Sequence, residues 1–170
     1  MAMTKVSPEV VPQNQNTKAA CWYFCLRMMF QWKRDAGDIN KDPEKILELM
    51  DKSARLYPYE MRDKWGIAPD ECRETARTLG LTATGDGEID AGVLEDTLKT
   101  KGPIWIAGDW GLGNHVIVIT GCEPATGKIR FINPYQNLGG TDSPGTISWL
   151  NDREKNGNLW KSCDASVMTW

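Results

Sequence analysis

The stretch "PIWIAGDWGLGNHVIVITGC", residues 103–122, decides the fold of this chain. Two runs rich in β-branched residues, "PIWIAG" and "HVIVITGC", flank a segment that carries glycines, a pattern typical of paired strands. A third run, "GKIRFINP" at 127–134, follows the turn sequence "EPATG" at 123–127. The sequence therefore predicts three consecutive strands, and connections this short favour antiparallel pairing.

Before residue 103 the apolar residues recur with the period of a helix. The segment "AACWYFCLRMMFQWK", residues 19–33, predicts a mostly buried helix capped by Asn16 or Thr17. Further helices are predicted to begin at Pro43, to run from about 69 to 79 and to follow a cap at Asp90. Helices first and a mostly antiparallel sheet second define the class α+β.

The last 35 residues carry weaker signals. Residues 136–146 are rich in Gly, Pro, Ser, Thr and Asp and predict a loop, and "TISWL" at 146–150 fits a strand or a short helix. The polar run "NDREKNGN" at 151–158 predicts a solvated turn, and "NLWKSCDASVM" at 158–168 a last strand. We expect one domain over residues 1–170 with an N-terminal arm at 1–12; it could also be a toxin domain cut from a longer chain.

Composition excludes several classes of function. The net charge is −3 with a sequence pI near 5.2, so a basic face for nucleic acid is not expected. No apolar run reaches the roughly 18 residues of a transmembrane span, and residues 1–20 lack the features of a secretory signal. We expect a soluble protein that acts in a cytoplasm, without membrane contact.

Five cysteines stand at positions 21, 25, 72, 122 and 163, without a Cys-x-x-Cys pair and beside a single histidine. This spacing does not suggest a metal site, and neither metal nor cofactor is expected. Cys21 lies near the start of the first predicted helix, where the helix dipole favours a thiolate. Cys25, one turn deeper, is the better candidate for the core, and Cys72, Cys122 and Cys163 are expected to pack there as well.

The single histidine, His115, stands where the glycine-bearing loop enters an apolar strand. A lone histidine is usually a satisfied core or surface residue. Strand alternation, however, gives this strand two buried faces with one polar residue at its end, and a base held there could face a helix start across a cleft. Eighteen residues later, Asn133 ends the next strand. Its amide oxygen could orient the imidazole, although an asparagine before proline is equally a turn initiator.

These residues resemble the papain-like cysteine proteases. Gln15 stands six residues before Cys21, Trp22 follows the cysteine, and a histidine and an asparagine come later in that order. More closely, "Q…ACW…MMFQW", "GPIWIAGDWGLGNHVIVITG" and "INPY" resemble the small bacterial proteases related to AvrRpt2, a plant-pathogen effector, and to toxin domains used between bacteria. The signature Cys-Gly-Ser/Ala-Cys-Trp of the plant enzymes is replaced here by "KAACW".

The resemblance implies a role for each residue of this constellation. Cys21 would be the nucleophile, His115 the general base and acid, Asn133 the orienting residue and Gln15 the oxyanion donor, with Gln13 as the fallback. An imidazolium–thiolate pair would attack a peptide carbonyl and pass through a thioester. Trp22 and Trp110 are candidates to line the substrate cleft. The relatives further imply a toxin acting in a target-cell cytoplasm and an immunity protein as a partner.

Other functions fit part of the pattern. A deamidase, a transglutaminase or a cell-wall amidase of the NlpC/P60 kind would also pair a cysteine at a helix start with a histidine on a strand. The glutamine six residues before Cys21 and the later Asn133 favour a peptidase. A binding module on the same scaffold, without catalysis, predicts an ordinary thiol pKa at Cys21.

Overall fold

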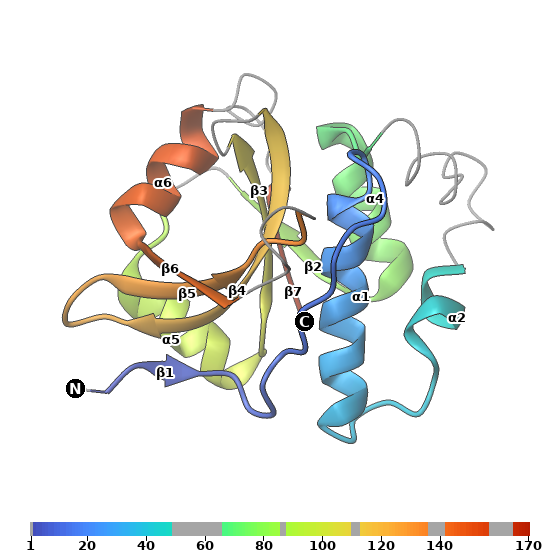
Figure 1. Ribbon diagram of the computed structural model, residues 1–170, viewed down its shortest axis with the longest axis horizontal. Coiled ribbons are helices and arrows are strands. Elements are labelled where there is room, and N and C mark those ends of the chain that lie inside the picture. Colours follow the sequence, from blue (N-terminus) through green and yellow to red (C-terminus); the bar gives the residue numbers. More distant parts are fainter. Residues whose placement is uncertain (1, 49–65, 86–87, 110–112, 136–141, 157–164) are drawn as a thin grey trace.

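The computed structural model describes residues 2–48, 66–85, 88–109, 113–135, 142–156 and 165–170. Figure 1 shows a central sheet with helices on both sides. Helix α1 (Cys21–Asp35) packs on β3 and β4 of the sheet, with α2 (Pro43–Leu47) and α4 (Pro69–Leu79) beside it. Helices α5 (Ala91–Thr100) and α6 (Ile147–Asn156) lie on the other side. The class α+β is confirmed.

The strands are β1 (Thr4–Lys5), β2 (Thr82–Thr84), β3 (Ile104–Asp109), β4 (Asn114–Glu123), β5 (Lys128–Ile132), β6 (Asp142–Thr146) and β7 (Val167–Thr169). Their order is β2-β7-β3-β4-β5-β6, and β1 pairs with β4. Every pairing among the described residues is antiparallel. The three predicted strands are therefore confirmed as β3, β4 and β5, which form the centre of the sheet.

Most predicted helix ends are confirmed. The Asp42 and Asp90 side chains accept hydrogen bonds from the first backbone amides of α2 and α5, and Gly80 ends α4 with a φ of 74°. The predicted cap of α1 at Asn16 or Thr17 is wrong. Helix α1 begins at Cys21, after Ala20, and no side chain caps it. The reason is local: the Gln15 side chain bonds the carbonyls of residues 17 and 18 and holds a turn there.

The C-terminal region corrects two further predictions. Part of the predicted loop, residues 142–146, is the edge strand β6, where the sheet tolerates a proline because the outer edge needs no partner. The predicted turn at 151–158 is helical in its described part, 151–156, and "ISWLN" begins that helix. The Trp149 ring stacks on Phe131 with centroids 4.9 Å apart, and Leu150 is fully buried, so tertiary packing selects the helix. Of the predicted last strand, 158–164 lies outside the described residues, and β7 (Val167–Thr169) covers its end.

The core lies between the sheet and α1. Strand β4 is buried on both faces along 116–122, as its apolar run predicts. The Trp105 indole N–H on β3 donates to the carbonyl of Trp22, 3.2 Å away, and so ties the first turn of α1 to the sheet. Cys72 and Cys122 are buried as expected, and Cys163 lies outside the described residues. This packing places Cys21 against the end of β4 that carries His115.

Candidate active site

The first turns of α1 dock on an open edge of β4. Strand β3 pairs with β4 over residues 114–119, whereas β5 joins β4 only from Val118 onward. The amide of Ala107, which lies opposite Val116 on β3, donates to Ser166, so the Val116 main-chain groups point away from β3. Two thiols of α1 meet these groups: Cys25 Sγ donates to the Val116 carbonyl at 3.4 Å, and the Val116 amide hydrogen-bonds the Cys21 sulfur.

His115 and Asn133 are in direct contact. The Nε2 atom of His115 lies 2.7 Å from Oδ1 of Asn133, and the same oxygen accepts the backbone amide of Tyr135 at 3.0 Å. Because a backbone N–H can only donate, this second bond identifies the atom as the oxygen, and Nε2 must carry a proton to donate to it. Nδ1 is then the basic nitrogen of the neutral ring. Asn133 thus initiates the turn before Pro134 and also holds the imidazole.

The ring of Tyr135 stands edge-on to the imidazole. The two centroids are 6.2 Å apart and the planes meet at 89°. Tyr135 is half-buried. Its backbone amide bonds Asn133, and its ring contacts the imidazole of His115. It was not predicted from the sequence, although "INPY" contains it.

Gln15 links the loop before α1 to the loop that carries Asn133. Its backbone amide donates to the Pro134 carbonyl at 2.7 Å. Its side-chain Nε2 donates to the carbonyls of Thr17 at 2.8 Å and Lys18 at 3.2 Å, and its buried Oε1 has no partner in the structure. Gln15 therefore lies beside Pro134, and its side-chain nitrogen is bonded to the backbone carbonyls of its own turn.

The remaining candidates are placed differently. Trp22 is 1% exposed and packs in the core, so the prediction that it lines a substrate cleft is wrong. At the second position of α1 the indole faces the protein interior, since the helix is buried on nearly all sides. The backbone amide of Gln13, the fallback for Gln15, donates a hydrogen bond to the sulfur of Met28, 3.3 Å away. Trp110 lies outside the described residues.

Burial sets the ionisation of the catalytic candidates. It raises the pKa of Cys21 to about 11, and the backbone amides of Val116, Trp22 and Cys21 itself oppose that rise. Burial also lowers the pKa of His115, against the Asn133 hydrogen bond. Both directions favour the uncharged forms. Burial therefore favours a thiol and a neutral imidazole in the resting site, whereas the resemblance implies an imidazolium–thiolate pair.

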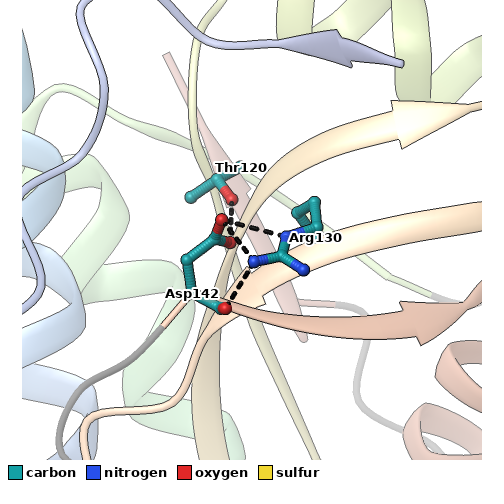
Figure 2. Close-up of polar contacts among 3 residues, drawn as sticks. All are labelled: Thr120, Arg130 and Asp142. Carbon is teal, nitrogen blue, oxygen red and sulfur yellow. Dashed lines mark hydrogen bonds and ion pairs between the residues drawn. The ribbon is translucent and has the colours of Figure 1, made fainter. Parts of the chain in front are cut away.

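A polar cluster joins β4, β5 and β6 at Thr120, Arg130 and Asp142. Figure 2 shows Asp142 between Arg130 and Thr120. The Arg130 guanidinium donates to Oδ2 of Asp142 through Nε at 2.9 Å and Nη2 at 2.7 Å, and Thr120 donates to Oδ1 at 3.3 Å. Asp142 also pairs in register with Ile132, the residue before Asn133. A charged residue inside the apolar run "KIRFI" is the signal in the sequence that could have identified this cluster.

No group of three or more His, Cys, Asp or Glu side chains in the described part of the chain could hold a metal ion. None of the helices described is both long and apolar enough to cross a membrane.

Comparison with known proteins adds one match. The family model described as papain-like cysteine protease AvrRpt2 matches residues 5–153. This range contains Gln15, Cys21, His115 and Asn133. No curated protein matches the chain significantly.

Proposed function

Because the chain belongs to the family of papain-like cysteine proteases represented by AvrRpt2, and is thus a cysteine peptidase, we propose that Cys21 is its nucleophile and His115 its general base and acid. The observation that carries this assignment is the hydrogen bond between His115 and Asn133, beside the docking of α1 on the Val116 carbonyl through Cys25, one helical turn after Cys21. The Val116 amide, in the peptide bond that follows His115, also opposes the rise in the pKa of Cys21, so the thiol lies beside the residue whose imidazole is held by Asn133.

The proton moves as the nucleophile attacks. Nε2 of His115 is engaged by Asn133, so Nδ1 receives the thiol proton while the sulfur forms a bond to the peptide carbonyl carbon. The Asn133 oxygen stabilises the resulting imidazolium without adding a charge. His115 then protonates the leaving amine, and water attacks the thioester to release the acid and regenerate the thiol. A neutral resting pair fits this order of events, since charge separates only when substrate has displaced water.

The oxyanion needs hydrogen-bond donors near Cys21. The amide of Cys21 lies at the start of α1, where the first backbone N–H groups have no partner within the helix. We assign the second donor to the Gln15 side chain. It would exchange the longer of its two bonds, the one to Lys18, for the oxyanion.

Cleavage of an unfolded protein mixture tests the assignment. New N-termini are identified by mass spectrometry after incubation with the wild type, Cys21→Ala, His115→Ala and the control Cys72→Ala. Peptide bonds cut by the wild type and by the control, and left intact by the other two variants, support the proposal. Equal cleavage by Cys21→Ala contradicts it. Incubation with peptidoglycan and with glutamine peptides in the same series tests amidase and deamidase activity, and turnover there alone would favour those alternatives.

We also propose that the enzyme is an effector or toxin that acts on proteins in the cytoplasm of a target cell. The support is the match to the AvrRpt2 family, together with the resemblance of the motifs around Cys21 and His115 to effector and toxin proteases. Expression in a bacterial cytoplasm tests the toxin role: growth should stop with the wild type and continue with Cys21→Ala. A dedicated immunity protein would restore growth by blocking the site. Normal growth with active enzyme would contradict a role against bacteria.

A further inference from the structure

Cys25 is a buried thiol that the proposed mechanism does not use. It is fully buried one helical turn after Cys21, and burial raises its pKa well above the usual range. It is therefore a poor second nucleophile and a protonated hydrogen-bond donor. Its Sγ donates to the Val116 carbonyl, 3.4 Å away, between α1 and β4.

The bond between Cys25 and Val116 lies next to the proposed base, His115. Val116 follows His115 in the chain, and its carbonyl lies on the edge of β4 that β5 has not yet joined. A buried carbonyl without a partner costs free energy, and here the Cys25 thiol satisfies it. The same residue gives its amide to Cys21. Val116 is thus held by two thiols of one helix, four residues apart.

The structure assigns to Cys25 the role of a positioning residue: its thiol fixes α1 on the open edge of β4 and so sets Cys21 against His115. This role rests on the proposed function, because it concerns the geometry of the proposed catalytic pair. Without the bond, the Trp105–Trp22 contact would still hold the first turn of α1 to β3, so the fold would persist while the register of Cys21 on β4 loosened.

The chain contains a matched control. Cys122 is also fully buried on β4, and its Sγ donates to the Ala91 carbonyl on α5 at 3.5 Å. The two thiols share their burial and the kind of acceptor. They differ in distance from the site, since Cys122 lies seven residues beyond His115 at the far end of the strand. Removing either thiol should lower the stability of the protein by a similar amount. Only the loss of the Cys25 thiol should change the reactivity of Cys21.

The test measures iodoacetamide labelling of Cys21, located by peptide mass, between pH 6 and pH 11. In the wild type, His115 should assist labelling near neutral pH, and His115→Ala should lack this part of the profile. Cys25→Ala and Cys25→Val should both slow labelling near pH 7 by roughly tenfold, the value of about one hydrogen bond. Cys25→Ser retains a donor and should keep most of the rate. Cys122→Ala should match the wild type, although its melting temperature should fall about as far as that of Cys25→Ala.

The outcomes separate the two proposals. If Cys25→Val keeps the wild-type rate near pH 7, or if Cys122→Ala loses as much as Cys25→Ala, the positioning role is wrong and the catalytic pair stands. If the wild type and His115→Ala label alike across the whole range, the catalytic pair is wrong, and the role of Cys25 fails with it. Because Cys25→Val fills the space of the thiol without a donor, agreement between the two donor-free variants excludes a simple packing effect.

Discussion

The carboxamide oxygen of Asn133 lies 2.7 Å from Nε2 of His115, and it accepts the Tyr135 amide as well. Two donors thus fix one oxygen, which in turn fixes the tautomer of the only histidine in the chain. The orientation of the proposed base is decided by a turn of three residues, Asn133 to Tyr135.

Replacing Asn133 should change both rate and pH dependence. Asn133→Ala removes the acceptor and should lower the peptidase rate on the order of tenfold or more. Asn133→Asp keeps the shape and adds a charge that stabilises the imidazolium, so the acid limb of the pH–rate profile should move to higher pH. The profile of rate against pH for the three proteins checks this. An unchanged acid limb in Asn133→Asp would mean that His115 is not the titrating base.

Gln15 should act in the transition state. Gln15→Ala removes the proposed oxyanion donor and should cost about 3 kcal/mol of transition-state stabilisation, or roughly a hundredfold in kcat, with little change in KM. The variant also loses the bonds to Thr17 and Lys18, so the melting temperature is measured beside the kinetics. Gln13→Ala is the matched control. A kcat that falls with Gln13→Ala and not with Gln15→Ala would transfer the role to Gln13.

Alkaline pH should destabilise the protein through Cys21. Its pKa is raised from 9.0 to about 11 in the folded state, so between these values the folded state holds a proton that the unfolded chain has lost. The stability that this contributes is complete below pH 9 and is lost as the pH rises through 11, in total roughly 3 kcal/mol. Urea unfolding of the wild type and of Cys21→Ser from pH 8 to pH 11 measures it. The serine variant should lose less stability over this range, and parallel losses would contradict the prediction.

The Arg130–Asp142 pair should stabilise the sheet beside the site. Asp142→Ala removes the carboxylate oxygen that accepts two hydrogen bonds from Arg130 and leaves the guanidinium, which is 27% exposed, without its carboxylate. We expect a loss of about 1–3 kcal/mol in the free energy of unfolding. Lys45→Ala breaks the exposed pair with Glu48 and should cost less than about 0.5 kcal/mol. Equal unfolding midpoints for the two variants in urea would show that the cluster contributes no more than a surface pair.

The regular elements could be predicted because their signals are local. The β-branched runs of β3 to β5, the Asp42 and Asp90 caps and the Gly80 end of α4 each depend on residues close together in the chain. Strands β1 and β2 were missed because two or three residues carry no periodicity. Helix α6 was predicted only as one alternative for 146–150, and its extension over 151–156 was missed, because its stability comes from Trp149 and Leu150 against the sheet while the segment that follows has a composition that favours a turn.

The sequence by itself determined the α+β class and the Cys, His and Asn candidates, because those depend on local periodicity and on the chemistry of single side chains. Only the tertiary structure decided how they meet. The register that leaves the Val116 edge open, the burial that favours the uncharged forms of Cys21 and His115, and the placement of Trp22 in the core all arise from contacts between residues distant in the chain. Desolvation and strand register are properties of the packed molecule, and neither is encoded in a local pattern.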